Sequence, residues 1–163
     1  MKKFAALFLA LMMFLPVAAL AEDAVEADVF TSASVANFYE AYGLTGDDLM
    51  NAVNSQSGCY LIMTTNPDGT PNAGYFIFAI KKLNDKYYLQ LGLAANQSKL
   101  NLEANGEGLA VYAANPTGDK AYAMSGARFY FEAIEDADLL AELTKDARQG
   151  AMFYEITKVL PLG

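Results

Sequence analysis

The segment around Ser98 and Lys99 carries side chains that could bind a charged group. A predicted strand over 87–91 ends just before it, and a short predicted helix runs from there to Asn105. The first turn of a helix has unpartnered backbone N–H groups and a positive dipole end, so a hydroxyl and an ammonium there can hold a phosphate. A serine and a lysine in a first turn also serve simply as a cap and a solvated charge. Alone, the pattern is a weak indication of an anion site.

Two residue types common in catalytic sites are scarce. The chain has no histidine, which excludes Ser-His-Asp and Cys-His nucleophile pairs and removes most zinc sites. Cys59 is the one cysteine, so an internal disulfide and a Cys-x-x-Cys centre are both excluded. Its apolar neighbours Tyr60 and Leu61 predict a small buried residue rather than a reactive thiol. No obvious general acid or base stands out, and we predict no metal site.

Residues 1–21 have the pattern of a secretory signal peptide. Lys2 and Lys3 precede an uncharged apolar stretch over 4–17, and residues 19–21 give the small-x-small sequence that signal peptidase needs. The apolar stretch is short for a membrane-spanning helix, and no stop-transfer segment follows it. We therefore expect export to the periplasm or the medium, with no stable membrane anchor after cleavage.

The remaining chain is strongly acidic. The full sequence has 11 basic and 19 acidic residues and a net charge of −8, which becomes −10 when Lys2 and Lys3 leave with the signal peptide. Such a chain repels phosphate backbones and anionic membranes, so we expect no nucleic-acid partner. The roughly 140 residues left suffice for one domain. We expect a leader and an N-terminal helix over 22–44 and the folded domain over 45–163.

The stretch over 58–80 predicts a β-hairpin, because two apolar, β-branched and aromatic runs flank the turn sequence Asn66-Pro67-Asp68-Gly69. Apolar side chains occupy both faces over 75–80. A strand without a polar face is covered on both sides. Closure of a barrel, a bound ligand or a second subunit could supply the second cover.

The remaining elements follow from periodicity and turn residues. The predicted strands cover 58–65, 72–80, 87–91, 109–114, 121–133 and 152–159. Helices are predicted over 35–42, from Thr45 with a capping-box spacing to Asp48, and over 136–149. A bulge or a close backbone approach is expected at Ser125-Gly126 in the fifth strand.

Several of these pieces together resemble a known family. The matching stretches are Leu61–Ala73, Tyr87–Gly92, Ser98–Asn105, the strand Leu109–Tyr112, and Ser125–Phe129. Their order and spacing resemble the FMN-binding split-barrel proteins, which are pyridoxamine 5′-phosphate oxidase-like, over roughly Thr45 to Leu160. The resemblance implies a mainly β fold with flanking helices, built as a six-stranded antiparallel split β-barrel. It also implies a homodimer with a flavin nucleotide in the interface cleft.

The resemblance further implies where the flavin would lie. The residues that would flank its isoalloxazine and ribityl parts are Tyr75, Phe76 and Ile77 in one strand and Gln90, Leu91 and Gly92 at the end of another. Ser98 and Lys99 would bind the phosphate, and Arg128 could contribute a further positive charge from either subunit. The leading prediction is an exported FMN-binding protein that acts as a flavin-dependent oxidoreductase or electron carrier.

The sequence departs from the family pattern around the phosphate. Family members often carry two or more basic residues there, and their lysine lies farther upstream of the Asn-Leu pair than Lys99 lies from Asn101. This keeps open a non-catalytic split barrel that has lost flavin and holds haem, another tricyclic cofactor or an apolar ligand. Haem ligation would then depend on a tyrosine, a methionine or Lys99. A structural dimer without a ligand is the third alternative.

Overall fold

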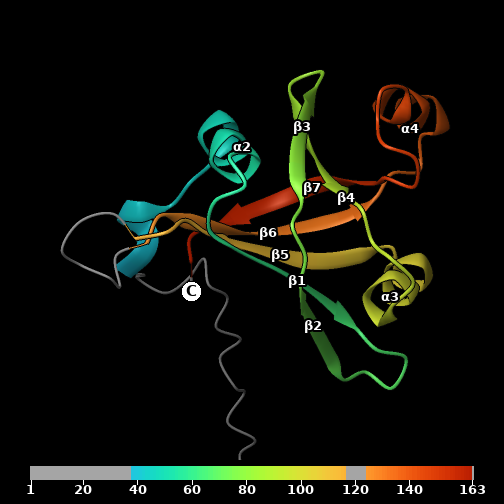
Figure 1. Ribbon diagram of the computed structural model, residues 1–163, viewed down its shortest axis with the longest axis horizontal. Helices are drawn as coiled ribbons and strands as arrows, with labels where there is room; N and C mark the ends of the chain where they lie inside the picture. The colour runs from blue at the N-terminus through green and yellow to red at the C-terminus, as the bar shows by residue number, and fades with distance from the viewer. Residues whose placement is uncertain (1–37, 117–123, 163) are drawn as a thin grey trace, which may run out of the picture. The chain divides into compact units, whose positions relative to one another are not determined.

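An antiparallel sheet forms the centre of the computed structural model, which describes residues 38–116 and 124–162 (Figure 1). Its seven strands are β1 (Cys59–Thr65), β2 (Pro71–Tyr75), β3 (Ala79–Leu83), β4 (Lys86–Leu91), β5 (Glu107–Ala113), β6 (Gly126–Ala133) and β7 (Met152–Leu160). The helices of the described residues are the short 3₁₀ helix η1 (Phe38–Tyr42), α2 (Gly46–Asn54), α3 (Gln97–Asn105) and α4 (Ala137–Thr144). The mainly β fold with flanking helices is therefore confirmed.

The strand order makes the sheet curl. The order is β2-β1-β5-β6-β7-β4-β3, so the two edge strands, β2 and β3, follow one another in the chain. Only residues 76–78 separate them. Because each residue advances the chain by less than about 4 Å, the two edges must lie close together. The edges are not hydrogen-bonded neighbours, so the curled sheet stays open between them.

The expected second strand over 72–80 is in fact two strands. β2 pairs with β1, where Tyr75 lies opposite Leu61, and β3 pairs with β4, where Ala79 lies opposite Gln90. The chain thus changes partner between residues 75 and 79. This break explains why the described residues form seven strands where the sequence predicted six.

The interior of the sheet packs against α2. Leu49 and Val53 of this helix are buried, and the Tyr60 hydroxyl donates a hydrogen bond of 2.7 Å to the Val53 carbonyl. Thr45 occupies the N-cap position but makes no side-chain capping bond, so the predicted capping box is wrong. Asp47 in the first turn instead accepts a hydrogen bond from Lys82 Nζ at 3.0 Å.

Cys59 is exposed, which overturns the prediction of a buried residue. β1 alternates, so Tyr60, Ile62 and Thr64 point into the core while Cys59 and Met63 face outward. Apolar residue types on both faces of the strand had hidden this alternation.

Gly126 confirms the expected close approach of two backbones. A Cβ atom on this glycine would lie 2.2 Å from the Tyr112 carbonyl oxygen on β5, so any side chain there would clash.

The predicted signal peptide over 1–21 and the leader up to residue 37 lie outside the described residues, as does 117–123 within the predicted fifth strand. No helix in the described ranges is long and apolar enough to cross a bilayer.

Candidate functional site

A cavity of about 550 Å³ lies where the end of β4 meets the loop before β7. Its lining comes from four segments: Gln56, Ile77–Ala79, Gln90–Ala94 and Arg148–Ala151. β4 pairs with β3 on one side and β7 on the other, with Gln90 opposite Ala79 and Leu91 opposite Met152. The sheet therefore brings three distant segments to one place.

The rim of the cavity opens where β4 ends. Leu91 is buried, whereas the next residue, Gly92, is exposed and begins the connection to α3. A Cβ atom on Gly92 would meet no other atom within 4 Å. The site can therefore be approached from this side.

The cavity wall includes an aromatic side chain that the core holds in place. The buried Phe78 ring packs edge-on against Tyr60 and Phe129, at centroid distances of 5.0 and 5.6 Å. Burial, aided by the hydroxyls of Tyr112 and Tyr75, raises the pKa of Tyr60, so this ring stays neutral at ordinary pH. The wall is thus apolar on this side and packed against the aromatic core.

Arg148 is the one ionisable residue among the described residues that line the cavity. It lies in the connection between α4 and β7, where the Ala151 N–H donates to the Arg148 carbonyl at 3.0 Å and Gly150 has a φ of 81°. This is a tight turn whose third position requires a positive φ, which glycine adopts without strain. The turn fixes the backbone from which Arg148 extends.

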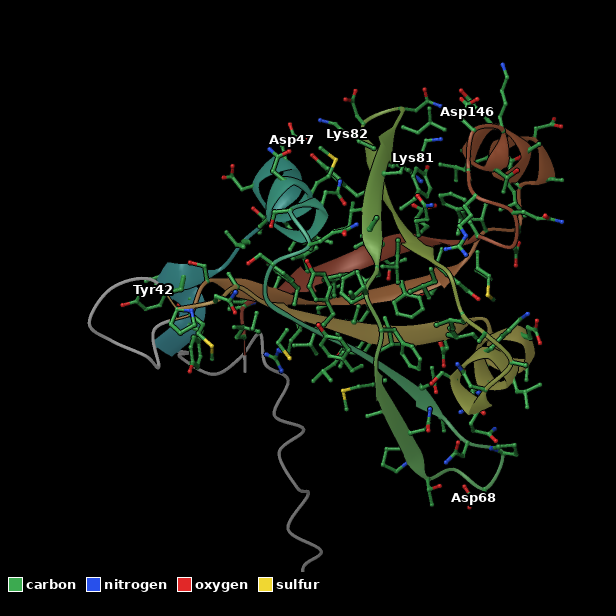
Figure 2. The ribbon with its side chains drawn as sticks, viewed as in Figure 1. Tyr42, Asp47, Asp68, Lys81, Lys82 and Asp146 are labelled. Carbon is green, nitrogen blue, oxygen red and sulfur yellow. The ribbon has the colours of Figure 1, made fainter. Side chains whose placement is uncertain are left out.

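The helix before this turn is shorter than predicted. α4 ends at Thr144 rather than continuing to residue 149. Lys81 Nζ on β3 donates to the carbonyl of Leu143 at 3.1 Å, and the Thr144 hydroxyl donates to the carbonyl of Leu140 at 2.8 Å. The Lys81 bond satisfies a carbonyl that would accept from the N–H of residue 147 in a longer helix. Lys81, labelled in Figure 2, lies beside α4 and ties its end to the sheet.

The structure brings together four of the six residues predicted to flank a ring. Ile77, Gln90, Leu91 and Gly92 all line the cavity. Tyr75 and Phe76 are not among its lining residues. Tyr75 is exposed at the end of β2, and Phe76 is half-buried against the core.

The predicted phosphate-binding residues lie elsewhere, at the start of α3. Ser98 is only 3% exposed, and its hydroxyl accepts a hydrogen bond of 2.9 Å from Asn72 Nδ2. Lys99 Nζ lies 3.7 Å from Glu103, and the Asn96 side chain caps the helix by accepting from the Lys99 N–H. Neither residue lines the cavity. Their role in phosphate binding stays a prediction.

Arg128, the remaining predicted residue, lies on β6 and does not line the cavity either. Its Nε donates to the Pro161 carbonyl at 2.8 Å. One terminal nitrogen, Nη2, is buried and has no partner in the described part of the chain. Its contribution to a bound anion also stays a prediction.

Sequence reasoning missed a buried network that fixes α3. Asn101 is 2% exposed; its Nδ2 donates to Thr64 Oγ1 at 3.0 Å and to Asn66 Oδ1 at 2.9 Å, and its Oδ1 accepts from Gln97 at 2.7 Å. Asn72 adds a bond of 3.1 Å to the same Thr64 oxygen. The signal was available, because Ser98, Asn101 and Leu102 follow a helical i, i+3, i+4 spacing that marks one buried face.

The outer face of β1, β2, β5 and β6 is mainly apolar, and its charged members are Arg128, opposite Val111, and the opposed pair Glu107 and Glu132. Cross-strand neighbours on it are Tyr75, Leu61 and Val111 in one row and Ala73, Met63, Leu109 and Tyr130 in the next. Met63, Tyr75 and Tyr130 are 36%, 57% and 43% exposed. A groove of about 370 Å³ runs beside Met63 and Tyr130. A contiguous apolar face of this kind typically marks an interaction site.

Among solved structures, this chain is similar to an FMN-binding protein from Syntrophomonas wolfei subsp. wolfei, with a TM-score of 0.52 and 15% identity over 72% of this chain and 86% of that one. HupZ from Group A Streptococcus gives a TM-score of 0.48, with 16% identity over 73% and 94% of the two chains. HutZ, the haem storage protein from Vibrio cholerae, gives 0.44, with 14% identity over 72% and 95%. Neither a protein-family profile nor a curated protein sequence matches the chain.

Proposed function

We propose that this chain, whose fold is that of the FMN-binding split-barrel proteins, binds FMN in the cavity at the end of β4. One observation carries the proposal: Ile77 and Gln90–Gly92, which the family resemblance places beside the isoalloxazine and ribityl parts, line a single cavity of about 550 Å³. That volume lies within the range of small-molecule sites.

The lining residues suit a flat ring with polar edges. Ile77, Phe78 and Leu91 provide apolar contact, and the amides of Gln56 and Gln90 can donate to and accept from ring heteroatoms. The flavin, when bound, supplies hydride or electron transfer, while the protein orients it. Since the described lining residues include no carboxylate, histidine or tyrosine, protons would come from solvent. The function that fits is therefore an oxidoreductase or electron carrier without a general acid or base of its own here.

Haem fits the cavity less well than FMN. Axial ligation of haem iron uses histidine, cysteine, methionine or tyrosine side chains. None of these, and no lysine, is among the described residues that line the cavity. The non-catalytic haem-binding alternative would need a different part of the molecule.

We also propose that a second copy of the chain covers the apolar outer face. Tyr75 lies on this face and Ile77, two residues further on, lines the cavity, so face and cavity adjoin. A partner seated on the face would reach the rim of the cavity and shield the ring from water. The exposed Met63 and Tyr130 would lose their contact with solvent in such a dimer.

A Met63→Asp variant tests the dimer. A charge placed on the apolar face must be desolvated in the interface, which costs several kcal/mol, so we expect the variant to sediment as a monomer where the wild type sediments as a dimer. Asn51→Asp adds the same charge at an exposed position on α2 and should leave the dimer intact. A wild-type monomer, or a Met63→Asp dimer of unchanged stability, would contradict the proposal.

Export is the third part of the proposal. The signal-like pattern over 1–21 supports secretion of an unfolded chain to the periplasm or the medium. The chain would then acquire its flavin outside the cytoplasm.

Titration of the mature chain, residues 22–163, with FMN tests the proposed function. We expect saturable quenching of flavin fluorescence and a shifted visible spectrum at one FMN per chain. Haemin added in parallel should give no saturable Soret shift. A chain that leaves the FMN spectrum unchanged up to millimolar concentration would overturn the proposal.

A further inference from the structure

We infer that Arg148 binds the negatively charged group of the ligand in this chain, in place of the Ser98-Lys99 pair. The inference rests on the proposed function and assigns the anion-binding residue of that site. It concerns a residue in the connection between α4 and β7, far in sequence from the stretch that resembles a phosphate site.

Arg148 has the position and the freedom to bind an anion. It lines the cavity and forms no ion pair with the described residues, although acidic residues outnumber basic ones in the chain. A guanidinium group presents a planar fork of donors that matches phosphate in a bidentate arrangement. A cation left unpaired in an acidic protein and facing a cavity is available to a ligand.

The Ser98-Lys99 pair lacks these properties. The Ser98 hydroxyl is buried and bonded to Asn72, so it does not face solvent. Lys99 lies near Glu103, and its N–H already bonds to the Asn96 cap. The positive end of α3 is thus partly used by the chain itself, and neither side chain lines the cavity.

The structure also holds the Arg148 segment in place. Lys81 bonds to the carbonyl of Leu143 and ties the end of α4 to β3, whose first residue, Ala79, lines the same cavity. The tight turn from Arg148 to Ala151 then leads directly into β7. Arg148 therefore extends from a backbone that is anchored at both ends, which lowers the entropic cost of binding.

Comparison of FMN with riboflavin, which has the same ring and ribityl chain but no phosphate, tests the inference. We expect the wild-type mature chain to bind FMN at least about tenfold more tightly than riboflavin, since a charge-assisted pair at a partly exposed site has that order of effect. Arg148→Gln should lower this ratio to about one by weakening FMN alone. Its riboflavin affinity should not change, and raised salt should weaken FMN binding only where Arg148 is present.

Two matched variants complete the test. Lys145→Gln removes a charge from the same connection at an exposed residue outside the cavity, and Lys99→Gln removes the charge at α3; both should keep the wild-type ratio. The inference is overturned if Arg148→Gln keeps the ratio, if Lys99→Gln loses it, or if wild type binds both flavins equally. In those three cases flavin binding itself survives. If wild type binds neither flavin, the proposed function and the inference fail together.

Discussion

A Gly92→Leu variant is expected to bind FMN about 10- to 100-fold more weakly than the wild-type chain, because a side chain forced into an occupied site costs about 1–3 kcal/mol. Gly92 lines the cavity at the end of β4, between the buried Leu91 and the connection to α3. A leucine there would take up the space into which the ligand enters.

The substitution should leave the fold unchanged. A Cβ atom on Gly92 meets no neighbour within 4 Å, and the φ of this glycine lies outside the left-handed region that favours glycine. We therefore expect the same free energy of unfolding as wild type in urea. Gly92→Ala, a smaller addition, should reduce FMN affinity much less. Equal FMN affinity in wild type and Gly92→Leu would place the ligand outside this cavity.

An Asn101→Leu variant is expected to lose about 2–4 kcal/mol of unfolding free energy, since each hydrogen bond contributes about 1 kcal/mol and stranded buried groups add a desolvation cost. Asn101 makes three side-chain hydrogen bonds, to Thr64, Asn66 and Gln97, at distances of 2.7 to 3.0 Å. Leucine has a similar volume but can replace none of them.

Asn105→Leu in the same helix is the matched control. Asn105 is exposed, and its side chain donates one bond of 3.0 Å to the Thr65 carbonyl. Its replacement should cost under about 1 kcal/mol, because water can satisfy the carbonyl that is released. Urea unfolding of both variants provides the comparison. Equal losses in the two would show that the buried network does not hold α3.

Local patterns were sufficient to predict most elements of this fold. Turn residues at 66–69 separate β1 from β2, and the helices predicted from Thr45 and up to Asn105 are present as α2 and α3. Interactions between residues near in sequence determine such features, so the sequence carries them directly. The second cover expected from the apolar faces over 75–80 stays a prediction, because Tyr75 and Ile77 are exposed in the single chain.

Features that depend on contacts between residues far apart in the sequence could not be predicted. The break between β2 and β3 follows from which strand each half pairs with, and no local residue marks it. α4 ends at Thr144, where Lys81, more than sixty positions away, bonds to the Leu143 carbonyl. Cys59 faces outward because β1 turns its other face, with Tyr60 and Ile62, into the core. Long-range pairing decides each of these cases.

In the candidate site, too, some residues could be proposed from the sequence and one could not. Ile77 and Gln90–Gly92 could be proposed from a resemblance, and they do line one cavity. Arg148 could not, since only the pairing of β4 with β7 brings its turn beside them. Its sequence signal, an Arg-Gln-Gly turn after an amphipathic helix, is too common to indicate a binding residue by itself.

The most direct test of the account is the electron density of crystals of the mature chain grown with FMN. The account predicts an isoalloxazine ring between Ile77 and Gln90, with the Arg148 guanidinium in contact with the phosphate and a second copy of the chain across the outer face. Flavin density at another place, or a cavity filled by side chains of the protein itself when FMN is saturating, would contradict it.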